Sequence, residues 1–225
     1  MARIDLHNFF KYYDEKNPNH IRAVQWLEDN LPEEFLDDSE TEWVGIYRSR
    51  QQQPSGVLDV PYYNQIDNYR DAHRTCNSSA CAMCLAYLRP GSIKGDDEYI
   101  KKVFAIGDTT DHSVQTKVLQ SYGVQSQFHY NLTFADLDVS LERGKPVVIG
   151  ILHRGSLKRP TGGHMVVVIG KTEDGSGYYI HDPYGSLNDN YTGPVSNGKR
   201  VIYSKAVLQH RWCPGGNDGW GRIFA

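Results

Sequence analysis

The sequence predicts an α+β fold in which helices come first and strands follow. Between residues 75 and 143, four segments combine helix-capping signals with the apolar spacing of helices. From residue 146 onward, three short stretches, two of them wholly apolar, have the composition of strands: 146–152, 165–169 and 178–182. Helical elements followed by a strand-rich half are typical of α+β domains.

The composition indicates a globular chain without a polyanionic partner. Its 225 residues suit one domain with an extension, or two small domains. Hydrophobic residues make up 39% and charged residues 23%, a balance that excludes a disordered chain. With 24 basic and 27 acidic residues the net charge is −3, so there is no electrostatic footprint for nucleic acid or an anionic membrane. We expect neither as a partner, and the sequence indicates no oligomeric state.

No segment has the pattern of a signal peptide or a membrane span. Residues 1–7 lack an apolar run, and nowhere do about 18 apolar residues follow one another. We therefore expect synthesis in the cytoplasm and a soluble product. Three of the four cysteines crowd one predicted helix and Cys213 stands far off, which does not fit a secreted disulfide framework.

Residues 1–53 are predicted to form a helical, aromatic-rich extension in front of the main domain, residues 57–225. An aromatic cluster occupies residues 9–13, and a helix is expected at 18–30, where a proline follows an asparagine cap. Polar, turn-forming residues at 51–56 separate the two parts. Three interpretations of the extension remain: packing on the main domain, recognition of a surface partner through the aromatic cluster, or an inhibitory propeptide.

The main domain begins with an expected strand at residues 57–63 and a polar loop at 64–74. A helix then starts near Thr75 and is stopped by Arg89-Pro90-Gly91. Capping residues, apolar spacing and alternation predict the next elements: helices at 96–104 and 113–122, a strand at 124–130 and a helix at 134–143. The Gly- and Trp-rich stretch 211–225 receives no regular structure.

Cys76 is the candidate nucleophile. It lies in the first turn of its predicted helix, where unpaired backbone N–H groups and the positive end of the helix dipole favour a thiolate. Cys81 and Cys84 are interpreted as small buried hydrophobic residues of the same helix. They have the two-residue gap of half a zinc site, but no second pair lies at zinc spacing. We therefore expect no metal and no cofactor.

His164 and Asp182 are the candidate partners of the thiol. Acyl transfer by a thiolate requires an imidazole, which keeps the thiol ionised and protonates the leaving amine, and an acceptor that orients it. His164 follows two glycines that let a substrate backbone come close, and it opens the apolar strand 165–169. Asp182 ends the next strand at a Pro-Tyr-Gly turn, which holds its carboxylate in one direction. The alternatives are a structural or exposed histidine and a plain turn-forming aspartate.

Gln65 is the candidate oxyanion-hole residue. Its side-chain amide and the Cys76 N–H are donors for the oxyanion that forms on the attacked carbonyl. His181 adjoins Asp182 but points to the opposite face of its strand, because side chains alternate along a strand. We therefore regard His181 as the poorer candidate for the imidazole.

Five motifs in a fixed order resemble those of a known family. They are Val60-Pro61-Tyr62-Tyr63-Asn64-Gln65, Thr75-Cys76 with Ser79, Ala82 and Met83, Gly144-Lys145-Pro146-Val147, Gly163-His164, and Asp182-Pro183-Tyr184-Gly185. Over roughly residues 57–212 the sequence is similar to the papain-like cysteine peptidases of the bacteriocin-processing, double-glycine-leader type. The resemblance implies a papain-like fold, in which a helical half carries the nucleophile and an antiparallel sheet carries the histidine and the aspartate.

The resemblance also implies roles for four residues. A nucleophile, a general base, an orienting acid and an oxyanion-hole residue correspond to Cys76, His164, Asp182 and Gln65, in that order. The sequence departs from the family at Asn77, because a glycine usually follows the nucleophile; larger residues there are found in phage-type relatives. No transporter segments follow, which argues against leader-peptide export.

A stand-alone relative of this kind resembles a phage lysin or virion enzyme that cuts the peptide stems or crossbridges of bacterial peptidoglycan. The resemblance therefore implies a cysteine endopeptidase that acts at the bacterial cell wall, after release or as part of a phage particle. Two other functions stay open. One is the processing of a protein precursor during virion maturation, with a polypeptide as substrate. The other is a catalytically inactive cell-wall binding module of the same fold.

Overall fold

The computed structural model describes residues Gly56–Ala225 together with Asn17, His20, Ala23 and Trp26. The chain divides into two units, Met1–Ser55 and Gly56–Ala225. The described residues within the helix predicted at 18–30 are helical, whereas the aromatic cluster at 9–13 lies outside the described residues. Within the described part of the chain, no helix combines the length and the apolar character that crossing a membrane requires.

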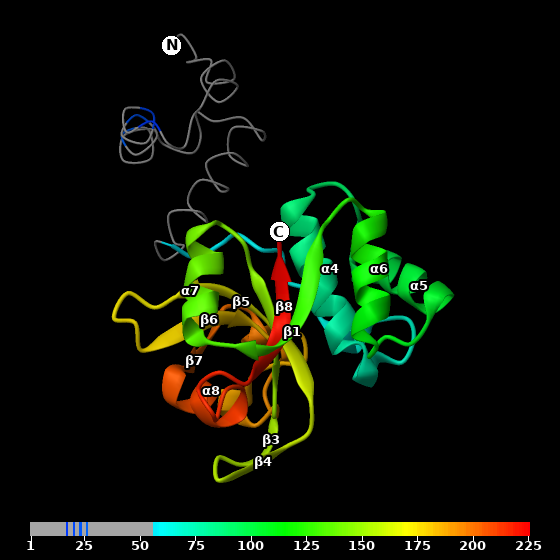
Figure 1. The fold of residues 1–225 in the computed structure, drawn as a ribbon. Helices are drawn as coiled ribbons and strands as arrows, with labels where there is room; N and C mark the ends of the chain where they lie inside the picture. The colour runs from blue at the N-terminus through cyan, green and yellow to red at the C-terminus, as the bar shows by residue number, and fades with distance from the viewer. Residues whose placement is uncertain (1–16, 18–19, 21–22, 24–25, 27–55) are drawn as a thin grey trace, which may run out of the picture. The chain divides into compact units, whose positions relative to one another are not determined.

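A six-stranded antiparallel sheet forms the centre of the main domain (Figure 1). In spatial order its strands are β1 (Ser126–Leu132), β8 (Gly219–Phe224), β2 (Val147–Ile151), β5 (His164–Lys171), β6 (Gly177–His181) and β7 (Val201–Ser204). All neighbouring strands pair antiparallel. A separate hairpin of β3 (Arg154–Ser156) and β4 (Arg159–Thr161) projects beyond the sheet.

Both faces of the sheet are covered, which explains why β2 and β5 are apolar at nearly every position. On one face, Val148 and Val167 belong to the same apolar cluster as helix α4 (Cys76–Leu88). On the other face, Ile149 and Val168 cluster with residues of α7 (Phe134–Glu142) and α8 (Lys205–Arg211). Because alternate residues of a strand point to opposite faces, each strand contributes to both cores. The strands predicted at 146–152 and 165–169 are confirmed.

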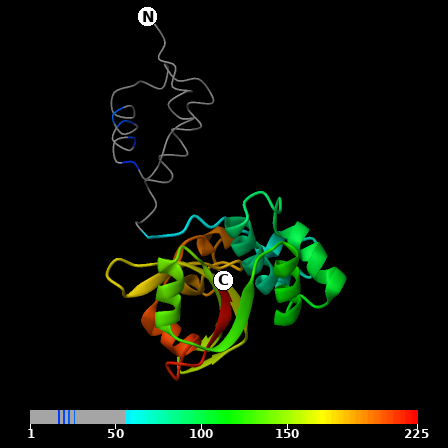
Figure 2. The same ribbon diagram turned by 45° about the horizontal axis from the view of Figure 1, so that its top comes forward.

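Three helices form the layer that carries the candidate nucleophile (Figure 2). Helix α4 packs directly on β5 and β2, while α5 (Asp96–Ile106) and α6 (His112–Ser121) pack against α4. Helix α4 is buried continuously from Asn77 to Leu85, because the sheet lies on one side and the two helices lie on the other. The three helices predicted in this part of the chain are confirmed, with small shifts at their ends.

Helix α7 shows why the local sequence folds as predicted. The Thr133 side chain accepts a hydrogen bond from the Asp136 N–H at 3.3 Å, and the Asp136 carboxylate accepts one from the Thr133 N–H at 2.8 Å. This reciprocal pair is a capping box, which satisfies two backbone donors of the first turn. After the helix, Gly144 adopts a φ of 69°, which costs a glycine little and turns the chain toward β2.

The prediction of a strand at residues 57–63 is wrong. The segment is extended but makes one strand-like backbone bond, from the Leu58 N–H to the Ile169 carbonyl at 2.7 Å. Pro61 has no N–H to offer to a ladder. The segment is held by side chains instead, since the Tyr62 hydroxyl donates to the carbonyl oxygens of Asp182 and Val195 at 2.9 and 2.8 Å.

Residues 211–225, for which the sequence predicted no regular structure, contain β8, which lies between β1 and β2. The glycines of β8 interrupt the alternation of apolar and polar residues from which a strand is predicted. A Cβ on Gly219 would lie 2.5 Å from the Trp212 ring, and one on Gly221 would lie 2.5 Å from the Val148 carbonyl oxygen. Close packing therefore requires glycine at both positions. The sequence did not predict β7, α8 or the β3–β4 hairpin either.

Candidate active site

Cys76 is the first residue of α4, as the sequence predicted. The residue before it, Thr75, ends the short turn η3 (Ala72–Arg74) and is also the N-cap of α4. The buried Thr75 hydroxyl donates to the Ala72 carbonyl at 2.9 Å and accepts from Asn68 Nδ2 at 2.8 Å. The half-buried thiol is thereby held at the positive end of a helix of 13 residues.

His164 and Asp182 meet where β5 begins and β6 ends. Antiparallel pairing of the two strands brings the start of one beside the end of the other. His164 Nε2 lies 2.6 Å from Asp182 Oδ1, and the two side chains are 4% and 0% exposed. A contact this short between an imidazole and a carboxylate is a charge-assisted hydrogen bond. Because Asp182 occupies Nε2, the other ring nitrogen of His164, Nδ1, is left for the thiol.

The electrostatics of the site favour a thiolate and an imidazolium. Burial by itself raises the pKa of the Cys76 thiol, while the hydrogen bond and positive charge of His164 lower it. Backbone N–H groups of Met165 and Asn77 also point at the sulfur, and the net result is a pKa below the ordinary thiol value. Burial lowers the pKa of His164, but the charge and hydrogen bond of Asp182 raise it to about 10. Both shifts favour the ion pair at neutral pH.

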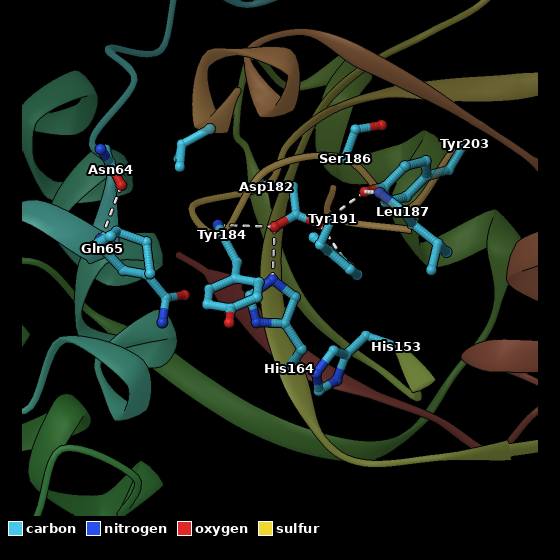
Figure 3. A network of polar contacts seen from close by, with 12 residues as sticks. Asn64, Gln65, His153, His164, Asp182, Tyr184, Ser186, Leu187, Tyr191 and Tyr203 are labelled. Atoms are coloured by element: carbon cyan, nitrogen blue, oxygen red, sulfur yellow. Dashed lines mark hydrogen bonds and ion pairs between the residues drawn. The ribbon is translucent and has the colours of Figure 1, made fainter. Parts of the chain in front are cut away.

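Four donors hold the Asp182 carboxylate (Figure 3). Oδ1 accepts from His164 and from the Tyr184 N–H, the latter at 3.0 Å. Oδ2 accepts from the hydroxyls of Tyr203 at 2.7 Å and Tyr191 at 3.0 Å. Burial and then the charge of Asp182 raise the pKa of both phenols, so both stay protonated donors. The carboxylate cannot rotate without breaking several hydrogen bonds, which fixes the orientation of the imidazole.

Tyr191 reaches the carboxylate from a strained turn. Asn190 and Tyr191 have φ values of 55° and 59°, in the left-handed region that bulky residues rarely adopt. The turn is held by backbone hydrogen bonds from Asn190 to Leu187 at 3.1 Å and from Tyr191 to Ser186 at 2.8 Å. Strain of this kind persists where the surroundings impose it, and it is common at functional sites.

Gln65 lies in the same hollow as the thiol and the imidazole. It opens the short turn η2 (Gln65–Asp67), and its side chain is 1% exposed. One N–H of the side-chain amide donates to the Ala72 carbonyl at 2.8 Å, which fixes the amide with its nitrogen on that side. The amide oxygen accepts no hydrogen bond from the described residues. The second N–H of the same nitrogen is the donor that an oxyanion hole requires.

Asn77, where the sequence departs from the family pattern, turns its side chain away from the hollow. Its Nδ2 lies 3.3 Å from His112 Nδ1 and 3.5 Å from the Thr109 carbonyl, at the start of α6. Asn77 is 2% exposed and does not line the hollow over the thiol. The side chain therefore fills the space between α4 and α6 and leaves the neighbourhood of the thiol open.

His181 is placed apart from the thiol, as the alternation of the strand predicted. Its Nδ1 accepts from the Arg200 N–H at 3.0 Å, so Nε2 carries the proton and donates to the Val60 carbonyl at 2.9 Å. Burial lowers the pKa of His181 to about 4. This neutral histidine ties the extended segment 57–63 to the sheet and has a structural role.

A hollow of about 320 Å³ lies over the thiol. Gln65, Cys76 and His164 line it together with Gly162, Gly163 and Tyr184. The glycine pair before His164 thus borders the thiol, as its position in the sequence predicted. In the described part of the chain, no three His, Cys, Asp or Glu side chains are arranged to hold a metal ion.

A comparison with protein families shows to which family this chain belongs. The model of the Peptidase_C39-like family matches residues 57–212, more than half of the chain. The chain belongs to the Peptidase_C39-like family. It is a cysteine peptidase, and the family and enzyme class predicted from the motifs are confirmed.

Two solved structures are similar to this Peptidase_C39-like chain. A C39-like peptidase from Bacillus anthracis is 17% identical with a TM-score of 0.52, over 75% of this chain and 96% of that one. A double glycine motif protease from an AMS/PCAT transporter, solved with its leader peptide, is 18% identical with a TM-score of 0.49, over 76% and 94%. The first likeness shows the fold, and the papain-like α+β class is confirmed. A search of curated proteins finds no match.

Tyr191, Tyr203 and His153 are residues of this Peptidase_C39-like site that the sequence did not predict. The tyrosines belong to no recognised motif, and the 15 tyrosines of the chain fit ordinary strand positions equally well. The His153 ring centroid lies 5.1 Å from that of His164. Burial lowers the pKa of His153 to about 4, helped by the positive charges of His164 and Arg154. This second histidine is therefore neutral at physiological pH.

Proposed function

We propose that the chain is a cysteine endopeptidase in which Cys76, His164 and Asp182 form the catalytic triad. The observation that carries the proposal is the 2.6 Å hydrogen bond between His164 and Asp182, next to a thiol whose pKa lies below its ordinary value. A thiolate, an imidazolium that can give up its proton, and a fixed carboxylate are the groups that acyl transfer requires.

In the first half of the reaction, the Cys76 thiolate attacks the carbonyl carbon of a peptide bond. A C–S bond forms while the carbonyl π electrons move onto oxygen, and the oxyanion accepts hydrogen bonds from the Gln65 amide and the Cys76 N–H. His164 then gives its Nδ1 proton to the amide nitrogen as the C–N bond breaks and the amine leaves. The product that stays on the enzyme is a thioester.

In the second half, neutral His164 accepts a proton from water. The water oxygen attacks the thioester carbonyl, and the C–S bond breaks with its electron pair returning to the sulfur. The acid product leaves, and the thiolate and imidazolium are restored. Asp182 keeps the ring in one orientation through both proton transfers, so Nδ1 always faces the reacting atoms.

For the substrate we propose the peptides of bacterial peptidoglycan, and for the place of action the cell wall, after release or on a phage particle. Asn77 supports this, because larger residues after the nucleophile are found in phage-type relatives of the resembled family. The form of the hollow supports it as well, because Gly162 and Gly163 have no side chains to obstruct a branched peptide and Tyr184 offers an aromatic wall. Crossbridged peptides are branched substrates of this kind.

The test is digestion of purified bacterial sacculi by the wild-type chain and by Cys76→Ala, with soluble fragments analysed by mass spectrometry for newly freed amines. We expect new amino termini from the wild type alone. Gln65→Ala should release the same fragments with a kcat lower by about 100-fold, the usual effect of losing one oxyanion-hole donor. Equal fragment release by wild type and Cys76→Ala would remove Cys76 from the mechanism.

If neither protein releases fragments, peptidoglycan is not the substrate. A library of peptides prepared from a whole proteome then separates the two other functions. Cleavage of this library by the wild type alone supports the processing of a polypeptide precursor. A protein that cleaves neither substrate but sediments with sacculi is a binding module.

A further inference from the structure

A second hollow adjoins the hollow over the thiol. It measures about 400 Å³ and shares the lining residues His153, Arg154 and Tyr184 with the first, so the two hollows lie side by side; we refer to them together as the groove. The residues that line the second hollow alone are Gly155, Asn190, Tyr191 and Arg211. Figure 3 shows that His153 and Tyr191 lie close to His164, so a peptide bound at the thiol can extend into this space.

The second hollow is basic. Arg154 and Arg211 line it, and no described residue that lines either hollow carries a carboxylate. The hairpin that bears Arg154 adds Lys158 and Arg159 and contains no acidic residue, although the whole chain has a net charge of −3. The carboxylate of Asp182 lies behind His164 and is engaged by four donors. Positive charge is therefore concentrated at one end of the groove.

Arg211 fixes the base of the hairpin. It is 7% exposed, and its guanidinium donates to the carbonyl oxygens of Leu152, Arg154 and Gly155, the last two at 3.0 and 2.9 Å. These acceptors are neutral, and none of the ion pairs between described residues includes Arg211. Burying a cation without a counter-ion costs free energy, which an anion in the hollow would recover.

Arg154 is held at the junction of the two hollows. Its Nε lies 3.2 Å from His153 Nε2, which accepts the hydrogen bond because the ring is neutral. The charges of His164, Arg154 and Arg211 all act on His153 in the direction that disfavours a proton. His153 thus adds no charge of its own, but it anchors an arginine that lines both hollows.

We propose that the second hollow is a subsite for a carboxylate of the peptide substrate, bound by Arg154 and Arg211. The inference rests on the proposed endopeptidase function and specifies its substrate: a peptide with a free carboxyl group close to the bond that is cut. Planar guanidinium groups match the two oxygens of a carboxylate. Peptide stems of peptidoglycan carry free carboxyl groups, so they belong to the class that the subsite selects.

The test compares sacculi with free carboxyl groups and the same sacculi after their carboxyl groups are converted to amides. We expect the wild type to release fragments from the free form at least about 10-fold faster, since one order of magnitude corresponds to a single charge-assisted hydrogen bond. Arg154→Gln should lower this ratio markedly, with Arg211 retaining a part of the preference, and Arg154→Lys should lower it less. Arg211 is left unchanged because it also anchors the hairpin.

Arg159→Gln is the matched control. It removes the same charge from the same hairpin, but Arg159 lines neither hollow, so the ratio should stay at the wild-type value. Equal rates of the wild type on both forms overturn the subsite. The subsite is also overturned if Arg154→Gln and Arg159→Gln lower the ratio equally, because the effect would then be one of overall charge.

The outcome for the subsite is separable from that for the proposed substrate. If the wild type digests neither form of the sacculi, peptidoglycan is not the substrate. The comparison is then repeated with the proteome-derived peptide library before and after amidation. Faster cleavage of the unamidated library, lost in Arg154→Gln, supports the subsite on a polypeptide substrate. Cleavage of both libraries at the same sites and rates overturns it.

Discussion

Tyr203 donates its hydroxyl proton to Asp182 Oδ2 at 2.7 Å, on the carboxylate oxygen that His164 does not use. The same hydroxyl accepts the Leu187 N–H at 2.9 Å. Tyr203 therefore joins the carboxylate to the loop that follows it. Together with Tyr191, it determines how far Asp182 can rotate and hence where the His164 ring points.

Tyr203→Phe should lower both stability and turnover. Removing a buried donor from an ionised acceptor costs roughly 1–3 kcal/mol in the free energy of unfolding. A carboxylate with fewer anchors positions the imidazole less accurately, so we expect kcat to fall about 10-fold while KM changes little. Tyr191→Phe should act in the same direction. Urea unfolding and steady-state kinetics measure the two effects.

Tyr178→Phe is the control for these variants. The Tyr178 hydroxyl also donates to a carboxylate, Asp138 Oδ1 at 2.8 Å, but this carboxylate belongs to α7 and does not contact His164. The substitution should lower stability and leave kcat within about 2-fold of the wild type. If Tyr178→Phe and Tyr203→Phe reduce kcat equally, loss of stability explains both, and the tyrosines have no positioning role.

The thiol of Cys76 should react at a pH at which ordinary cysteines do not. Because its pKa is lowered and that of His164 is raised to about 10, the ion pair exists between these two values. Iodoacetamide should modify Cys76 at a pH below the range in which ordinary cysteines react, and the rate should fall only as pH drops through the lowered thiol pKa. Activity should decline at the alkaline end as His164 loses its proton.

Mass spectrometry of the alkylated chain measures the modification of each cysteine separately. Cys81, Cys84 and Cys213 are buried and should stay unmodified in the folded protein. His164→Ala removes the main cause of the lowered pKa, so Cys76 in that variant should react at pH 8 to 9 and hardly at pH 6. A thiol in the wild type that requires the same alkaline pH would rule out the ion pair.

Asn77→Gly should preserve the chemistry and weaken the fold. The Asn77 side chain contacts Thr109 and His112 rather than the hollow, so its loss leaves the thiol and its donors in place. A glycine in the first turn of α4, without these hydrogen bonds, should cost about 1–2 kcal/mol in stability. We expect kcat within about 3-fold of the wild type. A fall of 100-fold would show that Asn77 shapes the oxyanion hole.

Asp96 should make the fold less stable as pH rises from 4 to 7. Burial raises the pKa of Asp96 to about 6, although the hydrogen bond that its carboxylate accepts from the Ser79 hydroxyl at 2.6 Å acts in the opposite direction. Between pH 4 and 6 the folded state therefore holds a proton that the unfolded state has released, and stability falls as pH rises through this range. Above about pH 6 the loss is complete, at roughly 3 kcal/mol.

Asp96→Asn has no proton to lose, so its stability relative to the wild type should increase with pH. Urea unfolding at pH 4.5 and pH 7.5 gives the comparison, and other titrating groups cancel because both proteins contain them. The free energy of unfolding of the variant, relative to that of the wild type, should be higher at pH 7.5 than at pH 4.5. An identical difference at the two pH values would mean that Asp96 ionises normally in the folded state.

The sequence predicted those elements whose local signals agree with their surroundings. Helix α7 has its capping box, and β2 and β5 are apolar because both of their faces are covered. Cys76, His164 and Asp182 each stand at the end of such an element, so a correct prediction of the elements also placed the three residues. Gln65 was proposed as a donor to the oxyanion, a role that the resemblance also implies, and it lies in the same hollow.

The missed features depend on contacts between distant parts of the chain. Strand β8 contains glycines because the Trp212 ring and the Val148 carbonyl lie against it, and neither neighbour can be inferred from the local sequence. Tyr191 and Tyr203 bind Asp182 from a turn and from another strand. The error at residues 57–63 has the same origin, since alternating apolar residues do not reveal that no ladder is available.

Strand β8 is made after all the other strands of the sheet, yet it lies between β1 and β2. During synthesis, β1 has no neighbour and β2 has one open edge until residues 219–224 have left the ribosome. The family match ends at residue 212, before this strand. Trp220 of β8 also packs where Gly150 has no side chain, and it lies beside Gly163. Completion of the sheet beside Gly163 and His164 thus waits for translation of β8, so we expect a chain that is still without residues 219–224 to lack peptidase activity.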